Sequence, residues 1–491
     1  MRRRLVLVCL VFAVFLNACV QTPPVYDLVI ANGRVIDPET GFDAVANVGI
    51  RDGQIAEIST QTLYGHDRLE AAGKIVAPGF IDIHSHSPSP LGVRYQVLDG
   101  VTTQLDLEVG AYPVSTYGAM IAGRSPIHYG SSVSHLAVRA KVIEGANKPY
   151  LFTEDGPLQP GLAFIAPATE AQIAQMRTRL IAGLEAGGIG IGVPLDYISV
   201  AVSDAELDMI FEVAAEHDAP VTVHVRRGLP GDPAGLIEVV RRAEATGAAL
   251  FICHITHSAM QAVPDWLAVI DAANARGARV TTETLSYAAG GTAISAAVFS
   301  RDWQSIFNIS YGDVQWTATG EWLTEERWHH YRATEPEGMI NHHYVKEDWI
   351  ETALRWPDMM VSSDVTPALS EDVLTNPNLA GTFARLIGHY SRDRGVIDLH
   401  DALSRISLLQ VRWLENSTLA FARKGRLQVG MDADIVVFDY DTIAARADYG
   451  DPYQPSKGID YVVVAGVPVV RGGQRIEDAY PGQQVLAGET P

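Results

Sequence analysis

Two histidines in the stretch Ile81-Asp82-Ile83-His84-Ser85-His86 have the spacing of a pair of metal ligands. Residues two apart on a strand point to the same face, so His84 and His86 can present two imidazoles to one point. The run before them is apolar and the segment after them is rich in Ser and Pro, which predicts a strand over 75–86 that ends at the histidines. Two such histidines are often ordinary half-buried residues, so a metal site requires further donors nearby.

The elements that would position such donors follow a regular order. Between about residues 75 and 364, apolar runs alternate with helical patterns, and the helices are marked by a capping box at Ser203–Glu206 and by terminal glycines such as Gly187, Gly247 and Gly277. We expect eight strands, at 75–86, 101–110, 128–136, 188–193, 220–225, 249–256, 278–285 and 359–364. Eight βα repeats predict an α/β fold of the TIM (β/α)8 barrel type, in which the chemistry lies at the carboxyl ends of the strands.

Short strands and turns occupy both ends of the chain. Segments 26–72 and 415–480 have hairpin patterns, and neither has enough apolar residues to close a sandwich alone, so we expect one small β-sandwich domain built from both. The barrel would then span 73–414. A segment rich in Trp and His, 300–357, interrupts it between the seventh and eighth strands and is expected to form a packed lid, with extra metal ligands as the alternative.

The predicted carboxyl ends of the strands carry a set of residues that could bind a metal. They are His84 and His86 on the first strand, Glu108 on the second, His224 on the fifth, His254 on the sixth and Asp364 on the eighth. Each alone could be a satisfied core histidine or a solvated carboxylate. Together at one rim, imidazole nitrogens and carboxylate oxygens are the donors that Zn2+ and related divalent metals prefer. One or two such ions are therefore expected.

Composition and the first residues limit the partners and the location. The 491 residues carry a net charge of -21 without a basic cluster beyond the N-terminus, which argues against nucleic-acid binding. Residues 1–19 combine an Arg-rich start, an apolar run and Leu16-Asn17-Ala18-Cys19, which resembles a bacterial lipoprotein signal with Cys19 as the lipidated residue. The sequence thus predicts a lipoprotein on the periplasmic side, held by its lipid anchor, with Val20 favouring the outer membrane.

The motifs together resemble the amidohydrolase superfamily, and more closely its D-aminoacylase branch, the N-acyl-D-amino-acid deacylases. The similarity extends over nearly the whole chain after Tyr26. It is carried by the stretch 77–86, Asp99-Gly100-Val101-Thr102-Thr103, Ser134-His135-Leu136, Val223-His224-Val225-Arg226, Cys253-His254-Ile255-Thr256, Thr281 to Tyr287, Ser362-Ser363-Asp364, Gly381-Thr382-Phe383 and Gly430-Met431-Asp432-Ala433-Asp434.

The resemblance implies a role for each donor. His84, His86 and Asp364 would hold one metal, and His224 and His254 a second. D-aminoacylases complete the second site with a cysteine, but Val109 stands at that position here, so we assign the role to the adjacent Glu108. Tyr197, Arg226 and Tyr287 are expected to bind substrate. A lysine that meets the substrate carboxylate in the family is replaced by Thr256.

The expected reaction is hydrolysis of a C–N amide bond in a small molecule, most simply an N-acyl-D-amino acid such as N-acyl-D-glutamate. A metal-activated hydroxide would attack the carbonyl, and Asp364 would move the proton as general base and acid. A cyclic amidase resembling dihydroorotase or hydantoinase, and a dipeptidase, would use the same chemistry. A non-catalytic anchored binding protein also fits the lipid signal, but it would not need the whole donor set.

The lipoprotein signal leads to the first prediction. Cys19→Ala should release the protein from the membrane fraction, because stable anchoring needs more than one acyl chain and no other lipid attachment is expected. Fractionation of cells that express the wild type and the variant measures this directly. Membrane association of the variant equal to that of the wild type would contradict the lipoprotein interpretation.

Overall fold

An eight-stranded parallel sheet forms the centre of the computed structural model, which describes residues 25–150, 152–153, 156–157, 161–198 and 200–488. The strand order is β19-β14-β13-β12-β11-β8-β7-β6, and every neighbouring pair is parallel. The strands are β6 (Phe80–Asp82), β7 (Val101–Ala111), β8 (His128–Ser134), β11 (Ile191–Val193), β12 (Val221–Val223), β13 (Leu250–Ile252), β14 (Val280–Thr284) and β19 (Met360–Val361). The predicted barrel is confirmed.

The barrel closes just beyond the last residues of its first and last strands. The amide of His86 donates to Val365 O at 3.1 Å, and the amide of Asp364 donates to His84 O at 2.7 Å. Most strands are shorter than predicted because the chain leaves the ladder early; His254, for example, has a φ of 33° and begins a helix. The residues that close the barrel are thus the ones expected to bind metal.

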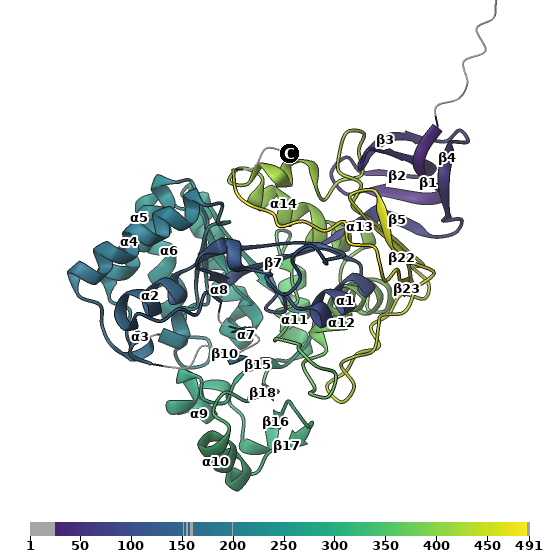
Figure 1. Ribbon diagram of the computed structural model, residues 1–491. Helices are drawn as coiled ribbons and strands as arrows, with labels where there is room; N and C mark the ends of the chain where they lie inside the picture. The colour runs from purple at the N-terminus through teal and green to yellow at the C-terminus, as the bar shows by residue number, and fades with distance from the viewer. Residues whose placement is uncertain (1–24, 151, 154–155, 158–160, 199, 489–491) are drawn as a thin grey trace, which may run out of the picture.

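Helices cover the outside of the barrel (Figure 1). They are α1 (Pro90–Leu98), α2 (His135–Glu144), α3 (Leu162–Ile165), α4 (Glu170–Glu185), α5 (Asp204–Glu216), α6 (Ala234–Thr246), α7 (Ile255–Ala259), α8 (Val263–Ala275), α11 (Glu347–Leu354), α12 (Asn378–Arg385), α13 (Leu399–Leu403) and α14 (Leu409–Leu414). Ser203 caps α5 through the amide of Glu206, as predicted, and Gly247 ends α6 with a φ of 79°. The Glu206 side chain does not complete the box, because it pairs with His135 and Arg139.

Both ends of the chain build a second, nine-stranded sheet, as predicted (Figure 1). Its strands are β1 (Val25–Asp37), β2 (Phe42–Arg51), β3 (Gln54–Ser59), β4 (Tyr64–Glu70), β5 (Ile75–Pro78), β20 (Ile435–Phe438), β21 (Ile459–Val464), β22 (Val467–Arg471) and β23 (Gln474–Arg475). One expectation was wrong: 75–86 is not a single strand. Residues Ile75–Pro78 pair with β1 and β20, and Gly79 separates them from β6. A Cβ at Gly79 would lie 2.3 Å from Thr102, so only glycine fits this crossing.

The insertion between β14 and β19 differs in its limits from the predicted lid 300–357. It contains a four-stranded sheet, β15 (Gly290–Ala293), β16 (Val314–Trp316), β17 (Glu321–Trp322) and β18 (Met339–His342), with α9 (Trp303–Phe307) and α10 (Glu325–Thr334). The sheet therefore begins before residue 300. Helix α11, placed in the lid by the sequence, packs on α7 and α8 of the barrel. The insertion projects from the barrel on the side away from the nine-stranded sheet (Figure 1).

Within the described residues, no helix is long and apolar enough to cross a membrane. The predicted signal 1–19, with Cys19, lies outside these residues.

A buried ion pair of the C-terminal segment lies against strand β8 of the barrel. Lys424 Nζ lies 2.6 Å from Asp434 Oδ2, while Asp434 Oδ1 accepts from the amide of Ala465 at 2.7 Å and lies 3.5 Å from Nε2 of His128 on β8. Although burial raises the pKa of Asp434, the Lys424 ammonium holds it well below its usual range. The carboxylate therefore stays charged and depends on its cation.

Removal of that cation should destabilise the fold. Lys424→Ala should lower the free energy of unfolding by about 3–5 kcal/mol, because it leaves a buried carboxylate unpaired. Chemical denaturation measures the loss, with the exposed Lys457→Ala as a control that should change stability little. If the two variants had equal free energies of unfolding, the Lys424–Asp434 pair would not stabilise the fold.

Candidate metal centre

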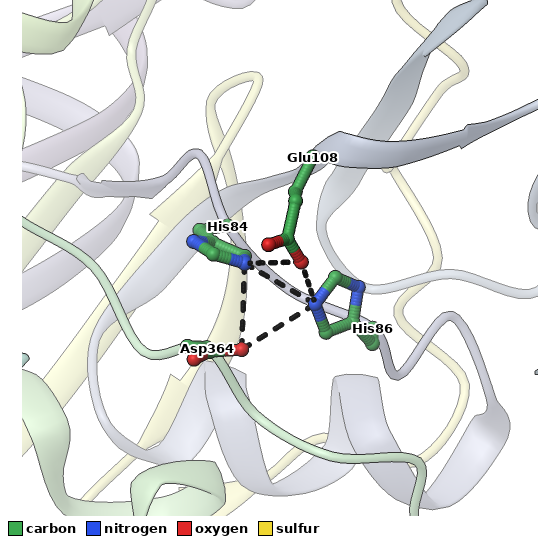
Figure 2. Close-up of side chains that lie close together, drawn as sticks. All are labelled: His84, His86, Glu108 and Asp364. Atoms are coloured by element: carbon green, nitrogen blue, oxygen red, sulfur yellow. Dashed lines mark hydrogen bonds and ion pairs between the residues drawn. The ribbon is translucent and has the colours of Figure 1, made fainter. Parts of the chain in front are cut away.

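Four side chains from three elements meet at the carboxyl end of the barrel (Figure 2). Nε2 of His84 lies 3.2 Å from Nε2 of His86, and each of these nitrogens lies 3.2 Å from Oε2 of Glu108. Oδ1 of Asp364 lies 3.3 and 3.4 Å from the same two nitrogens. All four donor atoms therefore surround one point.

Three donors form a second group that shares Glu108. Its other oxygen, Oε1, lies 2.7 Å from Nδ1 of His224 and 3.4 Å from Nε2 of His254, and these two nitrogens are 3.1 Å apart. Each oxygen of Glu108 thus faces a different pair of histidines. The structure brings together all six residues that the sequence predicted as metal ligands.

The backbone at the rim is shaped to aim these side chains. Asp364 and His254 have φ values of 48° and 33°. Residues other than glycine rarely adopt such angles, and each costs about 1–3 kcal/mol. Asp82 at the end of β6 accepts from the amide of Ser363 at 3.1 Å and from its hydroxyl at 2.5 Å. This contact fixes Asp364 relative to His84, because it joins the first strand to the last.

Two buried carboxylates that the sequence prediction missed hold the first histidine pair from behind. Nδ1 of His84 contacts Glu283 on β14, and Nδ1 of His86 lies 2.9 Å from Oδ2 of Asp106 on β7. A carboxylate on the far nitrogen fixes the ring and leaves Nε2 as the donor. Asp106 stands two residues before Glu108, so the strand period could have placed both on one face. Cys253 lies beside His84 and Glu283, behind the first donor group.

The imidazoles and carboxylates of this site act on one another's pKa values. Burial lowers the pKa of His84, but Glu283, Asp364 and Glu108 raise it well above its usual value. Burial likewise raises the pKa of Glu108, yet His84, His224 and His254 hold it well below the usual range. In the absence of a metal, protons supply the positive charge that the carboxylates need. Metal binding must displace them, so metal affinity decreases as pH falls.

The spacing of the first donor group fits divalent zinc. Bonds of about 2.0–2.1 Å in a tetrahedron place neighbouring donors about 3.3–3.4 Å apart. The first group shows 3.2–3.4 Å for the pairs given above. The second group offers three donors, which is the number that catalytic zinc sites use while they keep one position open.

A largely apolar pocket of about 520 Å3 opens onto both donor groups. Tyr197, predicted to bind substrate, lines it and shares a hydrogen bond of 3.0 Å with Thr292. Arg226 does not reach the pocket, because its guanidinium binds Glu238 and the carbonyl of Val202. The next residue, Arg227, lines the pocket instead.

Tyr287 also differs from the expectation. Its hydroxyl donates to Ala447 O at 3.0 Å, and Tyr287 is not among the residues that line the pocket. Thr256 is likewise buried against Thr284, with 3.0 Å between the hydroxyls. The structure therefore does not bring Arg226 or Tyr287 to the pocket, and their predicted role in substrate binding stays a prediction.

Within the described residues, none of the histidines of the insertion belongs to a group that could hold a metal ion. His342 stacks on Tyr344 with 4.9 Å between ring centroids and contacts Phe307, and burial lowers its pKa well below the usual value. It lines the pocket as a neutral ring. His329 and His330 are exposed on α10. The packed-lid interpretation agrees with these contacts.

A family model described as "Amidohydrolase family" matches residues 69–470. An N-acyl-D-glutamate deacylase from Alcaligenes xylosoxydans xylosoxydans is 31% identical over 477 residues, which cover 90% of this chain and 93% of that protein. A D-aminoacylase from the same organism is 27% identical over 503 residues, 93% of this chain and 96% of the relative. Fold, donor set and sequence define the class: the chain is a metal-dependent hydrolase and belongs to the amidohydrolase family.

Solved structures agree. The N-acyl-D-glutamate deacylase from Bordetella bronchiseptica, crystallised with zinc and a phosphonate mimic of the tetrahedral intermediate, superimposes with a TM-score of 0.78 at 28% identity. The match covers 94% of this chain and all of that one. A D-aminoacylase structure has the same TM-score and coverage at 23% identity, which shows a shared fold. A D-hydantoinase structure shares the fold less closely, with a TM-score of 0.60 at 18% identity.

Glu108 leads to the prediction for this site. Glu108→Ala should remove most of the bound metal and lower turnover by orders of magnitude, because both donor groups lose their shared carboxylate. Asp106→Asn should have a smaller effect, a loss of about 10- to 100-fold in metal affinity or activity, since Asp106 acts through Nδ1 of His86.

Elemental analysis of the purified variants measures the metal content, with the exposed Glu185→Ala as a matched control. A full metal complement and normal turnover in Glu108→Ala would disprove the shared-ligand assignment.

Proposed function

We propose that this protein is a zinc-dependent deacylase that hydrolyses the amide bond of N-acyl-D-amino acids. The observation that carries the proposal is the position of Glu108, whose two oxygens face two pairs of histidines at the base of one pocket. The relatives named as deacylases match over nine-tenths of the chain, and a similar structure was solved with zinc and a mimic of the tetrahedral intermediate.

The proposed ligands divide between two positions. His84, His86, Glu108 and Asp364 would hold one ion, and His224 and His254 with Glu108 would hold the other. A bound divalent metal supplies positive charge that polarises a carbonyl and lowers the pKa of water. The chain supplies the fixed geometry, because buried carboxylates behind His84 and His86 prevent both rings from turning.

Asp364 is proposed as the residue that moves the proton. Its side chain is 19% exposed and lines the pocket, whereas the Glu108 side chain is only 5% exposed. Burial raises the pKa of Asp364, but His84 and His86 hold it below the usual value, so the carboxylate is ready to accept a proton. The same group can return the proton to the leaving nitrogen. Tyr197 is proposed to contact the substrate carbonyl from the pocket wall.

A cyclic amidase is the second candidate in the same family. A dihydroorotase from Syntrophotalea carbinolica is 27% identical, but the match covers 52% of this chain and 60% of that protein. The deacylases match over nearly the full length, including the insertion that forms part of the pocket. The open-chain amide is therefore the preferred substrate class.

The activity test follows from the proposed zinc sites. Exhaustive chelation should abolish hydrolysis of N-acyl-D-amino acids, and zinc should restore it, while N-acyl-L-amino acids, dipeptides and dihydroorotate should be poor substrates. Asp364→Asn should retain most metal through the other donors but lose turnover by about 100-fold or more, because the proton carrier is lost. Release of the free amino acid measures the rate. Activity in protein shown by elemental analysis to be metal-free would overturn the proposal.

We further propose that the enzyme acts outside the cytoplasm as an anchored lipoprotein. The support is the segment Leu16-Asn17-Ala18-Cys19 after an apolar run. Its membrane fractionation test is the Cys19→Ala comparison given above.

A further inference from the structure

The pocket contains an arginine, Arg227, that forms no ion pair with a described carboxylate. Arg227 lies three residues after His224 and lines the same pocket as the donor groups. Its Nη1 donates to the hydroxyl of Tyr344 at 3.2 Å, and the guanidinium lies 5.4 Å from the centre of the Phe307 ring. Nε is buried without a hydrogen-bond partner. Among the described residues, no carboxylate oxygen forms an ion pair with it within 4.0 Å.

The neighbouring cation is already paired. Arg301 Nη1 lies 3.4 Å from Oδ1 of Asp196, and its Nη2 donates to the carbonyl of Arg227. Asp196 also accepts from the backbone amide of Arg227 at 3.0 Å, and it acts on the Arg227 guanidinium only from beyond ion-pair distance. Among the described residues that line the pocket, Arg227 is therefore the arginine that has no ion pair within 4.0 Å.

Much of the remaining wall is apolar, although Ser295, Ser300 and Glu337 also line it. Phe164, Val298 and Met339 line the pocket, together with Ile165 and Val200, whose side chains are among the exposed large hydrophobic ones at 64% and 77%. Exposed apolar side chains grouped at a cavity mark a surface that an apolar ligand covers. A volume of about 520 Å3 accommodates a ligand of drug size.

We propose that Arg227 binds the carboxylate of the substrate and that the apolar wall receives a large apolar group. A planar guanidinium with free N–H groups matches a carboxylate, and partial burial strengthens the pair. One free cation suits a substrate with one carboxylate, so an N-acyl-D-amino acid with an apolar side chain or acyl chain should be preferred over N-acyl-D-glutamate. This inference rests on the proposed deacylase function and narrows its substrate class.

The experiment compares substrates with and without the carboxylate. The assay uses the zinc-loaded wild type and two variants, Arg227→Met and Arg279→Met, with N-acetyl-D-leucine and N-acetyl-D-leucinamide as substrates. Arg279→Met is the control, because Arg279 is exposed and pairs with Asp218. Arg227→Met should lower kcat/KM for the acid by roughly 30-fold or more and leave the carboxamide nearly unchanged. The control should behave as wild type. The wild type should also hydrolyse N-acetyl-D-leucine faster than N-acetyl-D-glutamate.

A binding measurement separates this inference from the proposed function. Calorimetry measures the binding of N-methylsulfonyl-D-leucine, which is not hydrolysed, and of its carboxamide. The wild type should bind the acid more tightly than the carboxamide, whereas Arg227→Met should bind both with similar affinity. If Arg227→Met lowers kcat/KM equally for the acid and for the carboxamide, or lowers neither, the proposed role of Arg227 is overturned. If the wild type hydrolyses none of the amides, the deacylase proposal fails, and the difference in binding still decides whether Arg227 holds a carboxylate.

Discussion

Carboxylates and imidazoles are packed against each other in the centre of this protein with almost no access to water, and the rest of the structure depends on that contact. Glu108 is 3% exposed and lies between four imidazoles. A buried carboxylate without positive charge is very costly, so the site requires protons or metal ions at all times. The geometry of the donors therefore cannot relax far, and it is fixed by the strands that carry them.

The closure of the barrel and the assembly of the site are one event. Hydrogen bonds between His84 and Asp364 and between His86 and Val365 join the first strand to the last, and Asp82 binds Ser363 beside them. Because the ligands come from the first, second, fifth, sixth and eighth strands, they meet only when the whole sheet has formed. The strained φ values of His254 and Asp364 persist because these contacts over-determine them.

In the proposed assignment, substrate specificity depends on residues outside the donor set. The insertion supplies the wall opposite the metal donors through Phe307, Met339 and Tyr344, and the loop after β12 supplies Arg227. The insertion and the loop after β12 lie at the rim of the barrel and are not part of its core. A single barrel chemistry can thus act on different amides, since the residues that hold a substrate and the residues that break its bond lie on different segments.

The sequence by itself determined the elements and the donors. The period of two placed His84 and His86 on one face, and the rule that barrel chemistry lies at strand ends selected Glu108, His224, His254 and Asp364. Tertiary structure decided the rest. Side-chain direction places Arg227, and not Arg226, at the pocket, and it turns Tyr287 away from the pocket. The contact between Glu283 and His84 joins residues that are 199 positions apart. Periodicity describes faces of single elements, whereas these contacts depend on how separate loops pack, which no local pattern records.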